Sequence, residues 1–142
     1  MSKKPLIIST DPGIDDIAAM TISLFADELD VKMIVPTWGN VSLAHTLQNT
    51  LDLENFLHTK VPVVKGANQP LVRPAISAAS VHGETGIAGF EFEKANDDLL
   101  EPGLAATKMY EIIKNSPEKV TLLGVGPLTD FALLFKQYPD VV

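Results

Sequence analysis

The stretch PLIISTDPGIDDIAAM, residues 5–20, carries the pattern that decides the fold. The apolar run at residues 5–10 predicts a short buried strand, and the Pro-Gly pair that follows Asp11 predicts a sharp turn. Residues 15–26 then show the apolar spacing of a helix. Three carboxylates therefore surround the point where a strand passes into a helix: Asp11, Asp15 and Asp16.

The rest of the chain continues to alternate between strand-like and helix-like segments. We expect strands at 30–37, 61–66 and 119–125, and helices at 42–58, 102–117 and 126–139. Residues 67–98 have mixed polarity and predict a long loop with room for a short helix, and loops of this length are usually functional or mobile. This order predicts an α/β fold: a Rossmann-like parallel sheet with flanking helices, in a single domain over residues 1–142.

Composition excludes several classes of protein. The chain has 142 residues, 46% of them hydrophobic, which suits one globular domain with a real core. Lys and Arg number 11 against 18 Asp and Glu, a net charge of -7 that argues against a nucleic-acid partner. The absence of Cys excludes disulfides and thiolate metal sites. The N-terminal apolar run is too short for a signal peptide and no segment reaches membrane-spanning length, so we expect a cytoplasmic protein without a membrane partner.

Three motifs follow predicted strands and are expected to converge. TDPGIDD, TWGN and GVGPLTD each lie where a parallel strand ends, and ligands of such sheets bind outside the carboxyl ends of the strands. Helix capping and the helix dipole account for one or two of the acids. A third like charge raises the pKa of its neighbours unless a cation joins them, and carboxylate oxygens suit Ca²⁺ or Mg²⁺. The physical interpretation is a divalent cation held by Asp11 with Asp15 or Asp16, with one carboxylate able to take a proton from metal-bound water.

The motifs together resemble those of the nucleoside hydrolases, the inosine-uridine preferring N-ribohydrolase family. The resemblance rests on TDPGIDD, GNVSLAHTLQNTL, VPVVKGANQPLVRP, SVHGETGIAGFEF and VTLLGVGPLTDFALL, which occur in the family's order. It extends over essentially the whole chain. It implies Ca²⁺-dependent hydrolysis of the N-glycosidic bond of purine and pyrimidine ribonucleosides, giving base and ribose, in nucleoside salvage.

The resemblance also implies roles for individual residues. Asp11 is similar to the family's metal-binding general base, Asp16 to a metal ligand, and Asp15 to the partner of a ribose hydroxyl. Asn40 is similar to an Asn on the ribose side of the site, and is expected to be both catalytic and ribose-binding. Val125 aligns with the position whose backbone carbonyl binds the metal. His82 lies in the family's mobile loop near the substrate and is the third expected catalytic residue.

The chain also departs from the family pattern. Ser9 stands where the family commonly has a further Asp, and Asp130 stands where Asn is usual. Family chains are also longer, and their C-terminal half supplies another metal-binding Asp, an active-site His, and ribose-binding Asn and Glu residues. We therefore expect the N-terminal portion of a nucleoside hydrolase domain, with an incomplete version of the fold and a truncated catalytic site. Such a chain is expected to form a homo-oligomer or to depend on a missing C-terminal half.

The sequence also allows two alternatives to a nucleoside-hydrolysing enzyme. The first is a catalytically incomplete fragment, a binding or assembly module that takes Ca²⁺ or ribose without turnover. The second is nucleotide-phosphate binding, suggested by GVGPLT, but Thr129 replaces the third Gly of the dinucleotide fingerprint and no P-loop occurs. Calcium binding without ribose release distinguishes the first alternative from the enzyme.

Overall fold

Five parallel strands form one sheet in the computed structural model, which describes residues 2–142. The strand order is β4-β3-β2-β1-β5, and every neighbouring pair is parallel. The bounds are β1 Lys4–Thr10, β2 Leu29–Pro36, β3 Val63–Val64, β4 Leu100–Glu101 and β5 Thr121–Gly124. The predicted α/β fold with a parallel sheet is confirmed.

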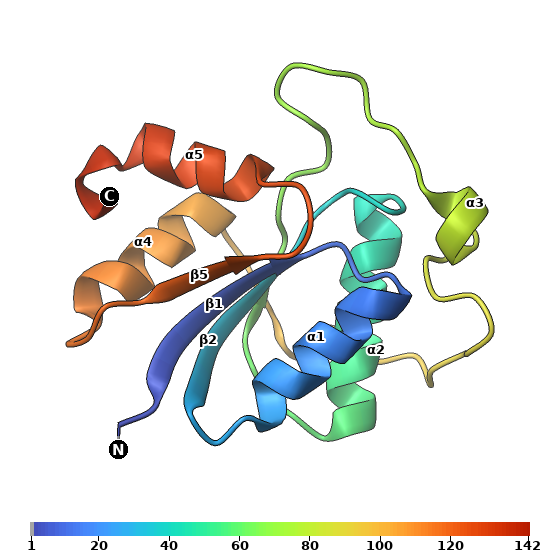
Figure 1. The fold of residues 1–142 in the computed structure, drawn as a ribbon, viewed down its shortest axis with the longest axis horizontal. Coiled ribbons are helices and arrows are strands. Elements are labelled where there is room, and N and C mark those ends of the chain that lie inside the picture. The colour runs from blue at the N-terminus through green and yellow to red at the C-terminus, as the bar shows by residue number, and fades with distance from the viewer. Residues whose placement is uncertain (1) are drawn as a thin grey trace.

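Helices cover both faces of this sheet. Figure 1 shows α1 and α2 on one face and α4 and α5 on the other. Their bounds are α1 Ile14–Phe25, α2 Leu43–Leu57, α3 Ala79–His82, α4 Ala105–Asn115, α5 Thr129–Gln137 and the 3₁₀ helix η1 Pro139–Val141. Within residues 2–142, none of the helices combines the length and the apolar character that crossing a bilayer requires.

Alternate side chains of the strands supply two separate cores. On the α4–α5 face, the strand residues Ile7, Met33 and Val35 pack with Met109, Phe131 and Leu134 of the two helices. On the α1–α2 face, Ile34 packs with Met20 and Leu53. Because strand side chains point alternately to the two faces, one short apolar strand is enough to serve both cores.

The strand order reverses beside β1. The chain moves outward from β1 through β2 and β3 to β4, and then returns to pair β5 with the free side of β1. Doubly wound sheets bind their ligands at this reversal, outside the carboxyl ends of the strands. Ser9 is level with Gly124 across the β1–β5 pair, so Asp11 and Gly126 leave the sheet side by side.

The predicted boundaries were wrong at several elements. The expected strand at 61–66 is reduced to Val63–Val64, and β4 was not predicted. A two-residue strand has no alternating pattern to detect, and β4 owes its assignment to its pairing with β3. The expected helix at 102–117 begins only at Ala105, after Gly103 with a φ of 112°, and the last helix begins at Thr129 instead of residue 126.

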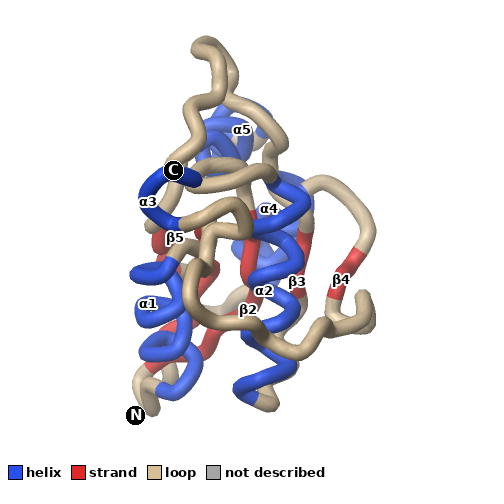
Figure 2. Tube along the Cα trace, turned by 90° about the vertical axis from the view of Figure 1, so that its right-hand side faces the viewer, coloured by secondary structure: helices blue, strands red, loops and turns tan. Residues whose placement is uncertain are grey.

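A long connection between β3 and β4 contains the predicted short helix, which is α3. Figure 2 shows this connection running over the carboxyl end of the sheet, with α3 near the start of α1. The loop therefore lies on the same side of the molecule as the acidic turn.

Candidate functional site

Asp11 occupies the centre of the site, directly after β1. Its side chain is only 6% exposed. Asn40 holds it at two points: the Asn40 backbone N–H donates to Asp11 Oδ2 at 2.8 Å, and Asn40 Nδ2 donates to the Asp11 carbonyl oxygen at 2.9 Å. The structure thus brings together two of the residues that the sequence predicted, from loops that follow adjacent strands.

Two glycines leave the space that the Asp11 carboxylate fills. A methyl group at Gly39 would overlap that carboxylate, at 2.6 Å from Asp11 Cγ. A methyl group at Gly126 would lie 2.5 Å from Asp11 Oδ1. Sequence reasoning missed both residues, although TWGN and GVGP each show a glycine just after a strand.

Asp16 is the second buried carboxylate, 4% exposed and in the first turn of α1. Its Oδ1 accepts a hydrogen bond from Thr10 Oγ1 at 2.7 Å, and its Oδ2 accepts one from the Gly13 N–H at 3.3 Å. The contact with Gly13 is a helix-capping contact, so helix capping accounts for one of the acids in this turn, Asp16. Asn40 Nδ2 also lies 3.5 Å from Asp16 Oδ2 and links the two carboxylates. Asp15, by contrast, is exposed.

The two buried acids are electrostatically strained. Burial raises the pKa of Asp11 to about 6, the Asn40 hydrogen bond opposes this shift, and the charge of Asp16 adds to it. Burial likewise raises the pKa of Asp16, against the hydrogen bonds from Thr10 and Gly13. Within residues 2–142, neither acid forms an ion pair with a basic side chain. Two adjacent buried carboxylates without a counter-charge are a site that a cation would relieve.

The oxygen atoms around Asp11 are of the type that binds a hard divalent cation, but they are few in number. Carboxylate and carbonyl oxygens are the ligands that Ca²⁺ prefers, and it takes six to eight of them. Asp11 and Asp16 offer two carboxylates, and the carbonyl of Val125 precedes Gly126, which abuts Asp11. No group of three or more His, Cys, Asp or Glu side chains suited to a metal occurs in the described part of the chain. The sequence expectation of three clustered carboxylates is therefore reduced to two, because Asp15 faces solvent.

His82 reaches the acidic turn from the long loop. Its Nδ1 accepts a hydrogen bond from the Ile14 N–H at 3.4 Å, at the start of α1. The preceding residues are fixed to the Asn40 carbonyl oxygen, which accepts from the Ala78 N–H at 2.8 Å and from Ser77 Oγ at 3.2 Å. The loop histidine therefore lies beside the predicted site, as the sequence motif indicated. His45 and His58 are both exposed.

Trp38 contributes to the neighbouring surface. Its Nε1 donates to Thr129 Oγ1 at 3.2 Å, which ties the loop after β2 to the start of α5. It also lines an apolar cavity of about 500 Å³ with Leu71, Ile76 and Leu128. Trp38 thus has a packing role, and its indole N–H has a partner, as half-buried Trp usually does.

The two departures from the family pattern are both buried. Ser9 Oγ has no hydrogen-bond partner among the described residues, although its side chain is only 1% exposed. Asp130 is 3% exposed, and both of its oxygens accept from the Ala67 N–H, at 2.9 and 3.2 Å. Burial raises the pKa of Asp130, and the Ala67 hydrogen bond opposes this shift.

Two substitutions of Asp130 should distinguish the effect of its charge on stability from the effect of the hydrogen bond that it accepts from Ala67. Asp130→Ala leaves the Ala67 N–H without its partner, and we expect the free energy of unfolding at pH 7 to fall by about 1–3 kcal/mol. Asp130→Asn keeps an acceptor oxygen and removes a buried charge, so we expect stability equal to or above that of the unsubstituted chain. Urea denaturation of the three proteins measures both effects. Equal losses in the two variants would contradict this assignment.

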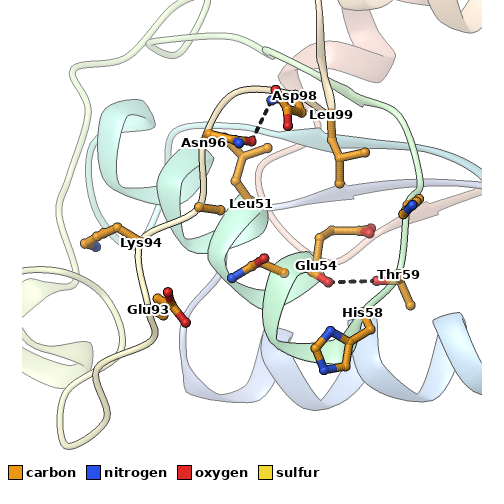
Figure 3. A pocket seen from close by; sticks show the side chains of 12 residues that line it. Leu51, Glu54, His58, Thr59, Glu93, Lys94, Asn96, Asp98 and Leu99 are labelled. Atoms are coloured by element: carbon orange, nitrogen blue, oxygen red, sulfur yellow. Dashed lines mark hydrogen bonds between the residues drawn. The ribbon is translucent and has the colours of Figure 1, made fainter.

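A cavity larger than the one beside Trp38 lies elsewhere. It has a volume of about 600 Å³ and is lined by the end of α2, including Glu54 and His58, and by residues 93–96, 98 and 99. Figure 3 shows Glu54 and Leu51 opposite Leu99 across this cavity. Because α2 starts near the carboxyl end of β2 and ends before β3 begins, this cavity is at the other end of the sheet from Asp11. None of the residues predicted for the site line it.

These observations define a class of protein: a doubly wound α/β domain with two buried carboxylates at its strand-order reversal. The sequence profile described as inosine-uridine preferring nucleoside hydrolase matches residues 6–142. The chain belongs to this family.

Curated relatives and solved structures agree with this assignment. The non-specific ribonucleoside hydrolase RihC of Klebsiella pneumoniae subsp. pneumoniae is 45% identical over 139 residues, which are 97% of this chain and 45% of the relative. RihC of Salmonella agona is 44% identical over 136 residues, 95% of this chain and 44% of the relative. The purine-preferring ribonucleoside hydrolase from Gardnerella vaginalis superimposes with a TM-score of 0.90 at 26% identity, over 97% of this chain and 45% of that one. The chain spans less than half the length of the curated relatives it matches.

Proposed function

We propose that the chain carries the acidic half of a Ca²⁺-dependent site that hydrolyses the N-glycosidic bond of purine and pyrimidine ribonucleosides. One observation carries the proposal: two adjacent carboxylates, buried and without basic partners among residues 2–142, lie at the strand-order reversal of a nucleoside hydrolase fold. The names of the curated relatives, which are non-specific ribonucleoside hydrolases, support the substrate class.

In this proposal Asp11 acts as the general base. A carboxylate with a pKa of about 6 can accept a proton from an attacking water near neutral pH, and Asn40 keeps its Oδ2 in place. Asp11, Asp16 and the Val125 carbonyl would hold the cation, which would lower the pKa of a bound water and offer a contact to the ribose hydroxyls. The fixed negative charge also favours an oxocarbenium-like transition state at the ribose.

The remaining residues take supporting roles. Asp15 is exposed on the first turn of α1 and is available to a ribose hydroxyl, as is Asn40 beside Asp11. His82 is placed to contact substrate from the loop. We also propose a cytoplasmic location and a role in nucleoside salvage, because the reaction would release a base and a ribose for reuse.

Assembly belongs to the same proposal. β5 pairs only with β1 among the described strands, and the exposed Val125 and Leu128 adjoin its open edge. Open strand edges and apolar patches favour association with another chain or with a second copy. We expect sedimentation of the purified chain to show a homo-oligomer.

Ribose release tests the proposal directly. The purified chain is incubated with inosine and with uridine, first with Ca²⁺ and then with a chelator, and reducing sugar is measured. Turnover that the chelator abolishes supports the enzyme. Calcium binding without turnover instead favours the alternative, a cation-binding module.

Cation binding has its own test. We expect Asp11→Ala and Asp16→Ala each to abolish measurable Ca²⁺ affinity in calorimetric titration while the chain stays folded, because each removes one of two carboxylate ligands. Asp27→Ala, on an exposed acid outside the site, is the control. Unchanged calcium binding in both site variants would rule out the metal assignment.

A further inference from the structure

Asn49, a buried residue in the middle of α2, contacts two segments that are far apart in sequence. Its side chain is 2% exposed. Its Nδ2 donates to the Thr85 carbonyl oxygen at 2.7 Å and to the Pro12 carbonyl oxygen at 3.3 Å. One amide group therefore joins the acidic turn to the loop that carries His82.

The backbone of the loop crosses the acidic turn at this point. Gly86, next to Thr85, is buried with a φ of 90°, and a methyl group there would lie 3.1 Å from the Pro12 carbonyl oxygen and 3.2 Å from Asn49 Nδ2. Ile87 is also buried, at 7% exposure, while the loop on either side is exposed. The loop is therefore anchored to the protein at Gly86 and Ile87, whereas the residues on either side face solvent.

The acidic turn depends on side-chain amides at two successive carbonyl groups. Asn40 Nδ2 holds the Asp11 carbonyl oxygen and Asn49 Nδ2 holds that of Pro12. A turn that leaves a strand has no neighbouring strand to satisfy its carbonyl groups, and a buried carbonyl without a donor is costly. Asn40 belongs to the site itself, whereas Asn49 reaches it only through the backbone.

We propose that Asn49 is a positioning residue that couples the His82 loop to the cation site. Its amide fixes the peptide between Asp11 and α1, and the same amide holds the loop closed at Thr85. Binding at the acidic site and closure of the loop then favour each other, and by linkage the coupling is equal in both directions. This inference rests on the proposed cation site, but the contact itself is independent of it.

Adjacent amides on α2 provide a matched pair of variants. Asn49→Asp replaces the NH₂ donor by an oxygen that faces two carbonyl groups. Gln48→Glu makes the same chemical change one residue earlier, where Gln48 Nε2 donates to Asp52 Oδ1 at 2.7 Å and to the Ala95 carbonyl oxygen at 3.2 Å. Gln48 therefore holds the far end of the same loop and does not contact the acidic turn.

Hydrogen exchange and calcium titration of the whole chain test the coupling. For Asn49→Asp we expect amide exchange at residues 83–87 to accelerate about tenfold and the Kd for Ca²⁺ to rise about tenfold, the size expected for one buried hydrogen bond. Added Ca²⁺ should slow exchange at residues 83–87 in the unsubstituted chain and in Gln48→Glu, but not in Asn49→Asp. A residue with a purely structural role would not remove this response.

The outcomes separate the inference from the proposed function. A folded Asn49→Asp with unchanged loop exchange and unchanged Ca²⁺ affinity overturns the inference, as does a Gln48→Glu variant that weakens Ca²⁺ binding equally. If the unsubstituted chain does not bind Ca²⁺, the proposed cation site fails and the coupling fails with it, while faster exchange in Asn49→Asp still establishes the loop anchor. Should Asn49→Asp not fold, Asn49→Ser keeps one donor and should give intermediate exchange; exchange at the unsubstituted rate would count against the anchor.

Discussion

Replacement of Asp11 by Asn should make the chain more stable at pH 8 in the presence of a chelator. Asn removes a buried charge but keeps an oxygen that can accept from the Asn40 N–H. With a folded-state pKa of about 6 against the ordinary value of 3.8, the charged form of Asp11 opposes folding by about 2–3 kcal/mol at pH 8. We expect the free energy of unfolding to rise by up to that amount, measured by urea denaturation.

The sign of the pH dependence follows from proton linkage. Between pH 3.8 and about 6, the folded chain keeps the Asp11 proton and the unfolded chain loses it. A rise in pH across this window therefore favours unfolding of the unsubstituted chain. The advantage of Asp11→Asn should be complete above the window, shrink as pH falls through it, and vanish below it.

Exposed acids and added calcium provide the controls. Asp27→Asn makes the same chemical change at an exposed site, and we expect a change within about 0.5 kcal/mol. Calcium should remove most of the difference between Asp11→Asn and the unsubstituted chain, because ligand at one hundred times its Kd adds about 2.7 kcal/mol to a chain that binds it. An Asp11→Asn variant less stable than the unsubstituted chain at pH 8 without calcium would show that the Asp11 charge is not strained.

A single methyl group added at Gly39 should weaken Ca²⁺ binding strongly. The new Cβ overlaps the Asp11 carboxylate and would lie 2.7 Å from Asp11 Cβ, so either Asp11 or the loop must move. Movement of the loop breaks the bond from the Asn40 N–H to Asp11. For Gly39→Ala we expect Ca²⁺ affinity to fall at least tenfold and stability to fall by about 1–3 kcal/mol, as overpacked cores do.

Gly89 offers the matching control. Nothing lies within 4 Å of a methyl group placed there, although its φ of 92° makes Ala strained. Gly89→Ala should therefore lower stability by about 1 kcal/mol and leave Ca²⁺ affinity unchanged. If Gly39→Ala titrates calcium like the unsubstituted chain, the space beside Asp11 is not set by this glycine.

Local signals in the sequence were enough for the frame of the molecule. The run at residues 5–10, the Pro-Gly turn and the apolar spacing of α2 each depend on near neighbours, and these elements lie within a residue or so of the predicted bounds. The strand that contains β3 was predicted, but longer than it is, whereas β4 exists through its pairing with β3, which no local pattern encodes.

The residues of the candidate site could be proposed from the sequence, but the hydrogen bonds that connect them to the rest of the fold could not. Asp11, Asp16, Asn40 and His82 were found through motifs, and the structure brings them together. Asn49 reads as an ordinary polar residue of an amphipathic helix, and its role depends on where the loop crosses the turn. Asp15 shows the converse: adjacent acids in sequence differ in burial because successive helical residues point in different directions.

The pairing of β1 with β5 has a kinetic consequence. The acidic turn follows β1, whereas Gly126, which closes one side of Asp11, follows β5, far away in the sequence. Contacts of such large sequence separation form slowly, since a long loop must close before they yield any stabilisation. We therefore expect the Asp11 carboxylate to stay hydrated until β5 docks beside β1. Calcium that binds only the docked form would act chiefly on the unfolding rate, so the cation would hold β5 on the sheet.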